Sequence, residues 1–406
     1  MIRYIILTAL ILASTTLSAQ NRMSSAELGY LYDADHEFIV DHRIAQSNDK
    51  VKIYLKFYLN SGMVKVSDYN LRFDIRENYV SEKKTGSSIR LDSSFIIANA
   101  YREFFYAIEI DKGSNDNLVV IEIENIVRKT KYLYDIPIST NPNFTNNPFL
   151  IFDKTGVIPV FKNHINVGTT VRIKNVFNNE GSFEINGRIN NRPVAMPPFD
   201  ETKLNDPTVI SVDTIYGSTH DENFVFNNEG FYTINDSDDR SKVTGILVTS
   251  KFFPRYGEYK AMAQPLIYIT TSTEFNNIRE ATDTQKEFEN FVFGTVTNKP
   301  DIASNFVKYY FRRVEDGGQL FTSDQDGWKT DKGMLYQIFG NPRQVFRNDN
   351  TELWVYNFEG GGRVRFVFDI LKGDGNIKGY KLIRNKKYKE IWMNAVTRWR
   401  NGQVIE

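Results

Sequence analysis

Residues 327–342 have the sequence Gly327-Trp328-Lys329-Thr330-Asp331-Lys332-Gly333-Met334-Leu335-Tyr336-Gln337-Ile338-Phe339-Gly340-Asn341-Pro342, which contains both the start and the stop of a helix. Thr330 or Asp331 is suited to the N-cap, because its side-chain oxygen can accept a hydrogen bond from a free backbone N–H. Gly340 can take the left-handed conformation that ends a helix, and Pro342 cannot continue the hydrogen-bond ladder. We therefore predict a short helix that begins near Lys332.

The predicted helix has one apolar face. Met334, Leu335, Ile338 and Phe339 recur at the spacing of a single helical stripe. Trp328, just before the cap, is expected to pack back onto this helix, since large aromatic side chains usually serve core packing. On this interpretation the motif is structural and contains no catalytic, cofactor-binding or metal-binding residue. The motif residues are Gly327, Trp328, Thr330, Asp331, Gly333, Gly340 and Pro342.

Gly327, Trp328, Thr330 and Asp331 resemble the signature of the GWxTD-domain proteins, a family of bacterial envelope proteins without an assigned activity. The resemblance covers roughly residues 274–400, the last third of the chain. It departs from the family pattern at Phe291-Val292, where relatives carry a tryptophan. The resemblance implies a C-terminal α+β domain and no particular chemistry.

The first residues are typical of a secretory signal peptide. Arg3 supplies a positive charge, residues 5–12 are almost wholly apolar, and Ala19 is a small residue before a plausible cleavage site. The apolar run is too short to span a bilayer, which takes about 20 residues. We therefore predict a signal peptide over residues 1–19 and export to the periplasm or the outer-membrane periphery. Because the chain has no cysteine, no lipid anchor on a cysteine is expected.

The composition favours a β-rich protein that depends on burial for its stability. The lack of cysteine excludes disulfides, thiol catalysis and cysteine-based zinc sites. Lys and Arg number 50 and Asp and Glu also number 50, so no global field attracts nucleic acid. Aromatic residues make up 14% of the chain and stand mostly in alternating runs, which is typical of strands.

Alternating runs predict two β-sandwich-like (Ig-like) domains, at residues 20–140 and 149–272, before a C-terminal domain at 274–406. Residues 20–50 are expected to be an irregular lead-in. Strands are expected at 51–59, 71–75, 104–110, 118–127 and 132–138 in the first domain, and at 150–152, 157–161, 170–176, 224–226, 232–234 and 243–249 in the second.

The C-terminal domain is predicted to combine helices with an antiparallel sheet. Besides the motif helix, helices are expected at 277–293, 301–314 and 388–400, and strands at 353–358, 363–368 and 377–383. The predicted fold class is therefore mainly β with a C-terminal α+β domain.

The second β region contains an internal repeat. Residues 176–186 (VFNNEGSFEIN) and 225–235 (VFNNEGFYTIN) are identical at eight of eleven positions. Each copy is interpreted as strand, Asn-Asn-Glu-Gly turn and strand, with glycine supplying the positive φ. We expect two edge hairpins in one sandwich. The alternative is a pair of equivalent loops presented to a partner.

Few residues point to a chemical site. His36 and His42, with carboxylates nearby, could hold a metal, but no helical metal motif is present and a solvated surface is favoured. Asp326 and Asp331 flank the signature, and paired carboxylates could perform glycosidase chemistry. A capping or turn role is favoured for Asp331. No cofactor is predicted.

Basic residues are in excess between residues 371 and 400. Such a patch could contact lipid head groups, glycan phosphates or an acidic protein, although a solvated face is the favoured interpretation. The residues considered for this contact are Lys381, Arg384, Lys386, Lys387 and Lys389. As function we expect a non-catalytic scaffold or partner-binding subunit of the envelope. The alternative is a hydrolase of an envelope glycan or peptide that uses Asp326 or Asp331.

Overall fold

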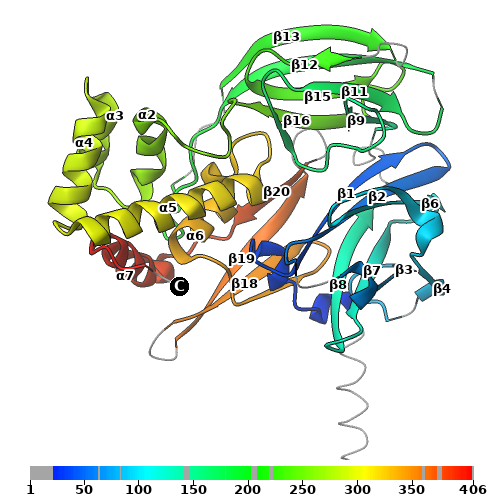
Figure 1. Ribbon diagram of the computed structural model, residues 1–406, viewed down its shortest axis with the longest axis horizontal. Coiled ribbons are helices and arrows are strands. Elements are labelled where there is room, and N and C mark those ends of the chain that lie inside the picture. Colours follow the sequence, from blue (N-terminus) through cyan, green and yellow to red (C-terminus); the bar gives the residue numbers. More distant parts are fainter. Residues whose placement is uncertain are drawn as a thin grey trace, which may run out of the picture.

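The computed structural model describes residues 22–62, 65–82, 84–140, 147–178, 180–202, 208–218, 223–358, 362–372 and 377–404. The predicted signal peptide lies outside the described residues. The chain forms two β-sandwiches and a C-terminal α+β domain, which confirms the predicted fold class. In Figure 1 the first sandwich lies at the lower right, the second at the top, and most of the helices at the left.

The first sandwich consists of two antiparallel four-stranded sheets, with the orders β1-β2-β6-β5 and β4-β3-β7-β8. Phe38 and Phe57 of one sheet contact Tyr69 of the other, with ring centroids 5.5 and 5.3 Å apart. The five strands predicted for this domain are present as β2, β3, β6, β7 and β8. The strands are β1 (Phe38–Gln46), β2 (Lys50–Leu59), β3 (Tyr69–Arg76), β4 (Lys84–Arg90), β5 (Ile96–Ala100), β6 (Glu103–Asp111), β7 (Asn117–Asn125) and β8 (Thr130–Ile138).

The irregular lead-in predicted for residues 20–50 is wrong for two segments. Residues 38–46 form β1, which pairs with β2 along its whole length. Residues 23–32 contain two short 3-10 turns with the buried side chains Met23, Leu28, Tyr30 and Tyr32. Polar residues stand between these apolar ones. The high polar content of the region therefore predicted an irregular segment, although it contains a strand and two packed turns.

The second sandwich packs a five-stranded sheet, β10-β16-β15-β12-β13, on a three-stranded sheet, β14-β11-β9. Its core is a hydrophobic cluster of its own, which includes Phe149, Phe183 and Ile234. The strands are β9 (Phe149–Asp153), β10 (His164–Asn166), β11 (Thr170–Asn175), β12 (Ser182–Asn191), β13 (Thr208–Ser218), β14 (Phe224–Val225), β15 (Gly230–Asp236) and β16 (Val243–Thr249).

The strand predicted at residues 157–161 is not formed. Asp153 Oδ1 accepts hydrogen bonds from the backbone N–H groups of Val157 and Ile158, each at 3.2 Å, which closes a turn. Pro159 has no N–H to donate and forms an isolated bridge with Phe152. The apolar run is therefore a packed loop.

The internal repeat is not a pair of edge hairpins. In each copy the turn leads from the three-stranded sheet to the five-stranded sheet, from β11 to β12 and from β14 to β15. Gly181 and Gly230 occupy equivalent places, with φ of 138° and 154°, where other residues would be strained. Asn179 of the first turn lies outside the described residues. Because β11 pairs antiparallel with β14, and β12 with β15, the two turns lie at opposite ends of the sandwich.

The C-terminal domain packs helices on an antiparallel sheet with the order β17-β18-β19-β20. Phe339 of the motif helix contacts Phe366 of β19 and Trp392 of the last helix, with ring centroids 5.6 and 5.9 Å apart. The strands are β17 (Gln344–Arg347), β18 (Thr351–Asn357), β19 (Arg363–Lys372) and β20 (Lys378–Leu382). The helices are α2 (Tyr259–Ala263), α3 (Ser272–Glu280), α4 (Thr284–Phe291), α5 (Pro300–Phe321), α6 (Asp331–Phe339) and α7 (Lys389–Arg400).

Two helix predictions need correction. The single helix expected at 277–293 is divided into α3 and α4, because Asp283 accepts a hydrogen bond from the Lys286 N–H at 3.0 Å and so caps a new helix. The helix expected at 301–314 continues to Phe321. Within the described ranges, no helix is both long and apolar enough to cross a membrane.

One hydrophobic core runs through the first sandwich and the C-terminal domain. The N-terminal segment 23–32 joins them. The Leu28 N–H donates to the carbonyl oxygen of Val345 in β17 at 2.8 Å. The Tyr30 hydroxyl donates to the carbonyl oxygen of Leu133 in β8 at 3.1 Å. The first and last parts of the chain therefore pack as one unit, beside the separate core of the second sandwich.

Candidate functional site

The signature residues lie where α5, α6 and the 3-10 turn Gly327–Lys329 meet. A Cβ on Gly333 would lie 1.9 Å from the carbonyl oxygen of Gly327, and a Cβ on Gly327 would lie 2.2 Å from that of Gly317. No side chain fits at either position without moving backbone. These two glycines therefore allow the close approach of two helices and the turn between them.

The motif helix has the predicted start and stop. Thr330 is its N-cap, since its hydroxyl accepts from the Gly333 N–H at 3.1 Å. Gly340 ends the helix with φ of 78°, and Pro342 is buried just beyond it. Trp328 is 1% exposed, and its ring meets that of Tyr268 edge to face with centroids 6.4 Å apart.

The Asp331 carboxylate is engaged on both oxygens. Its Oδ2 accepts from the backbone N–H of Leu382 at 2.7 Å, and its Oδ1 lies 2.5 Å from Nη2 of Arg384. Arg384 also donates to the carbonyl oxygen of Met196 at 2.9 Å. This carboxylate therefore ties α6 to the end of β20 and, through Arg384, to the second sandwich.

The loop that follows β12 lies against the signature. The Ala195 N–H donates to the carbonyl oxygen of Lys329 at 2.8 Å, and the Asn385 N–H donates to that of Pro198 at 3.0 Å. These bonds use backbone groups of the signature turn and of the chain just after Arg384. The signature thus holds a loop of the second sandwich in place.

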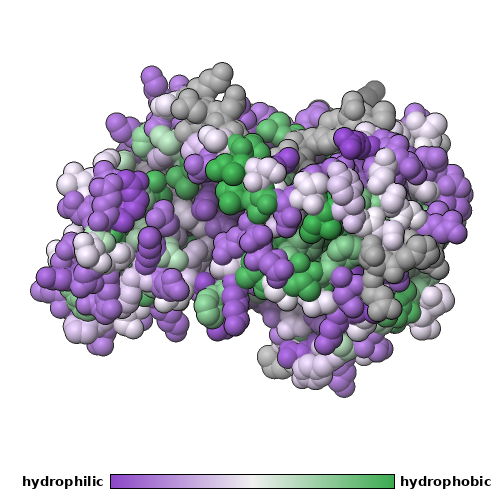
Figure 2. Space-filling view, turned by 90° about the horizontal axis from the view of Figure 1, so that it is seen from above, coloured by the Kyte–Doolittle hydropathy of each residue, from purple (hydrophilic) through white to green (hydrophobic). Residues whose placement is uncertain are grey.

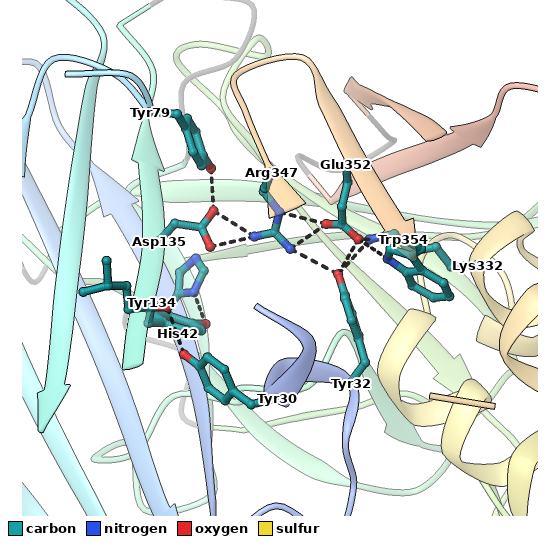
Figure 3. A network of polar contacts seen from close by, with 11 residues as sticks. Tyr30, Tyr32, His42, Tyr79, Tyr134, Asp135, Lys332, Arg347, Glu352 and Trp354 are labelled. Carbon is teal, nitrogen blue, oxygen red and sulfur yellow. Dashed lines mark hydrogen bonds and ion pairs between the residues drawn. The ribbon is translucent and has the colours of Figure 1, made fainter. Parts of the chain in front are cut away.

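A buried network of charges begins at Lys332, the residue after the signature (Figure 3). Lys332 Nζ lies 2.8 Å from Oε1 of Glu352, and Arg347 Nη2 lies 2.7 Å from the other oxygen. Arg347 also donates to both carboxylate oxygens of Asp135, at 2.7 and 2.8 Å. None of these four side chains is more than 7% exposed. The network therefore joins the C-terminal domain to β8 of the first sandwich.

Neutral donors complete the network. The Tyr32 hydroxyl lies 2.8 Å from Oε1 of Glu352, and the Trp354 indole N–H donates to the same oxygen at 2.6 Å. The Tyr79 hydroxyl donates to Asp135. Each buried carboxylate has an oppositely charged partner and a neutral donor, the condition under which proteins tolerate buried ion pairs.

The charges of the network shift one another's pKa values. Burial raises the pKa of Glu352, but Lys332 and Arg347 outweigh burial and lower it to about 2. Burial raises the pKa of Asp135 too, but Arg347, Lys378 and the Tyr79 hydroxyl together outweigh burial and lower it. Burial lowers the pKa of Lys332 to about 7, against the attraction of Glu352. Both carboxylates are therefore ionised at neutral pH.

Residues 230–401 match the family model of the GWxTD domain. The chain carries a GWxTD domain. The match begins in β15 of the second sandwich, whereas the resemblance noted in the sequence begins near residue 274. No curated protein is similar enough in sequence to match the chain.

Neither Asp331 of the GWxTD signature nor Asp326 just before it lines either of two hollows on the described surface. One hollow, of about 560 Å³, lies between α3 and α4. The other, of about 400 Å³, lies where the two sandwiches meet and includes the ion pair of Lys56 and Glu103. Asp326 pairs instead with Lys329 at 3.4 Å.

His36 and His42 are part of the first sandwich. The His36 ring packs edge to face against Phe38 and Tyr132. His42 Nδ1 lies 2.6 Å from the Tyr134 hydroxyl, and burial lowers the pKa of His42 to about 3. Both histidines are partly buried, so they are less solvated than the surface interpretation predicts. In the described part of the chain, no group of three His, Cys, Asp or Glu side chains could hold a metal ion.

The basic residues near the C-terminus do not form one free patch. Arg384 is bound to Asp331, and Arg400 pairs with Glu274 at 2.8 Å. The remaining candidates for a contact with lipid or glycan are exposed, and they are Lys381, Lys386, Lys387 and Lys389. That contact stays a prediction.

Sequence reasoning missed the charge network, although strand periodicity held a signal. Arg347 follows Val345 by two residues, and Glu352 precedes Trp354 by two, so each charge shares a sheet face with a buried apolar side chain. A charge in a core-facing register indicates a buried ion pair. Nothing local pointed to Asp135, which lies in another domain.

Proposed function

We propose that this chain is a non-catalytic protein of the bacterial envelope that acts as a scaffold or partner-binding subunit. The observation that carries the proposal is the state of Asp331. Both of its oxygens are used by Leu382 and Arg384, and the signature backbone holds a loop of the second sandwich. A carboxylate that serves packing in this way has no free position for a substrate.

The cellular location of the protein is part of the same proposal. The residues predicted as a signal peptide and the resemblance to a family of envelope proteins support export to the periplasm or the outer-membrane periphery. The four exposed lysines near the C-terminus would lie where lipid head groups or glycan can meet them.

The architecture also supports a binding role. One continuous core makes the first sandwich and the GWxTD domain a single packed unit, and the signature fixes the second sandwich to it. A chain built in this way presents a broad and fixed surface, which lowers the entropy lost when a partner binds.

The test is affinity purification of the tagged mature protein from cross-linked cell envelopes, followed by mass spectrometry. A tagged exported protein of unrelated fold serves as the control. We expect one or more envelope proteins in stoichiometric amounts with this chain and absent from the control. Recovery of the bait alone, together with hydrolysis of an envelope glycan or peptide that Asp331→Asn abolishes, would favour the hydrolase alternative instead.

A further inference from the structure

We propose that the outer edge of β13 binds an extended, apolar segment of a partner protein with a basic residue at its centre, which adds a strand to the second sandwich. This inference rests on the partner-binding function proposed above and assigns it a surface. β13 is the last strand of its sheet, pairs only with β12, and lies at the top of Figure 1. Among the described residues, none forms a backbone hydrogen bond with its outer edge between Thr208 and Gly217.

Large apolar side chains are exposed along this edge. Val209 is 57% exposed, Ile210 55% and Tyr216 74%. Ile189 of β12, the cross-strand partner of Ile210, is 46% exposed. Figure 2 views the molecule from the top of Figure 1, where β13 lies, and shows hydrophobic side chains near the middle of that face. An exposed apolar edge strand is a template for the pairing of another strand.

Other sheet edges of the described chain are short, irregular or in contact with other segments. β10 and β14 have three and two residues, and β4 and β5 carry register shifts. The backbones of β9 and β17 bond to other segments, and a side-chain hydrogen bond joins each of β1, β8 and β20 to another segment. β13 also has a register shift near Asp213, but apolar side chains are exposed on both sides of it. Residues 203–207 and 219–222, which flank β13, lie outside the described residues. β13 is therefore a long apolar edge that the described chain leaves open.

The charge of β13 selects the kind of partner. Asp213 is the single charged residue of the strand and stands at its centre. If two copies of this chain paired their β13 strands antiparallel with full overlap, Asp213 would face Asp213. Like charges directly opposite each other destabilise a pair of strands, whereas Lys or Arg opposite Asp213 would stabilise it. The edge therefore fits a basic segment of another protein better than a second copy.

The test places a photo-crosslinker on this edge in the full exported protein. Tyr216→p-benzoylphenylalanine probes β13, and Tyr101→p-benzoylphenylalanine is the matched control, because Tyr101 is 81% exposed on the first sandwich. We expect position 216, and not position 101, to crosslink to a different protein in intact envelopes. Mass spectrometry of the crosslinked peptide is expected to give an apolar segment that contains Lys or Arg.

Two further variants link the capture to the chemistry of the edge. In the protein with the crosslinker at 216, Asp213→Lys is expected to reduce the yield of the crosslinked complex roughly tenfold. The reason is that position 213 would then carry the same charge as the basic residue of the partner segment. Ile210→Lys is expected to reduce it as well, since a lysine on an edge strand opposes pairing. Circular dichroism checks that each variant is folded. If Asp213→Lys alters the spectrum, the crosslinking yield of Ile210→Lys is used for the test instead. An unchanged yield, a crosslink to a second copy, or a captured segment without Lys or Arg would overturn the inference.

The outcomes also separate this inference from the proposed function. If position 216 captures nothing while affinity purification recovers a stoichiometric partner, the role of β13 is wrong and the partner-binding function stands. If neither experiment recovers a partner, both are wrong.

Discussion

The guanidinium of Arg347 binds both carboxylate oxygens of Asp135, at 2.7 and 2.8 Å, although the two residues are 212 positions apart in the chain. Asp135 belongs to β8 of the first sandwich, and Arg347 belongs to β17 of the GWxTD domain. Both side chains are buried, so loss of Arg347 leaves Asp135 without its ion-pair partner, and loss of Asp135 leaves Arg347 with Glu352 alone. The first sandwich and the GWxTD domain therefore depend on each other for stability.

Removal of the guanidinium tests this dependence. We expect Arg347→Met to lower the free energy of unfolding by about 3–5 kcal/mol, because Asp135 loses its ion-pair partner and Glu352 keeps only Lys332. Urea unfolding followed by tryptophan fluorescence measures the change. Arg279→Met is the control, since Arg279 pairs with Glu280 on the surface and should cost less than about 1 kcal/mol. Equal effects of the two substitutions would contradict a buried network.

Gly333, two residues after the signature, allows a sharper test of packing. Gly333→Ala is expected to lower the free energy of unfolding by about 3 kcal/mol, because its Cβ would meet the carbonyl oxygen of Gly327. Gly294→Ala is the matched control, since no atom beyond its chain neighbours and its own helical backbone lies within 4 Å of the Cβ it would add. That change should be nearly neutral. The same urea measurement applies, and a wild-type midpoint for Gly333→Ala would show that the signature is not closely packed.

Local features of the fold could be predicted because their causes lie close together in the sequence. Thr330 caps α6 through the N–H of a residue three positions away, and Gly340 ends the same helix. Strands such as β2 follow directly from an alternating pattern. Such features need no knowledge of the rest of the chain.

Features that depend on distant segments could not be predicted. The internal repeat was visible as two similar turns, but turn residues do not determine which sheet receives the next strand, and both turns cross between sheets. Arg347 and Glu352 stood in core-facing register, yet Asp135, the second partner of Arg347, could not be known before the domains were placed together. Asp331 was expected to cap a helix or to shape a turn, and its bonds instead reach Leu382 and Arg384.

The contacts of Asp331 predict a loss of stability rather than of chemistry. Asp331→Asn is expected to lower the free energy of unfolding by about 1.5–3 kcal/mol, since it removes the charge that Arg384 binds. Asp326→Asn is the control, because its pair with Lys329 is longer and partly exposed, and it should cost less than about 1 kcal/mol. If Asp331→Asn left stability unchanged but abolished an activity on envelope glycan or peptide, a catalytic role would have to replace the structural one.

The partly buried ring of His42 predicts a loss of stability in mild acid. Burial, with Lys378 and Arg43 nearby, lowers the pKa of His42 from 6.5 to about 3. Between these values the unfolded chain binds a proton that the folded chain does not. The free energy of unfolding therefore falls as the pH falls from 6.5 toward 3, by at most about 1.4 kcal/mol per pH unit.

His42→Gln should remove this contribution, since glutamine does not titrate. Urea unfolding at pH 6.5 and about pH 5 is the measurement, a range in which the carboxylates of the unfolded chain are still largely ionised. We expect the free energy of unfolding of the variant to change less across this range than that of the native chain. Equal slopes for the two proteins would mean that His42 takes up its proton in the folded state, and that the ring is not held neutral beside Tyr134.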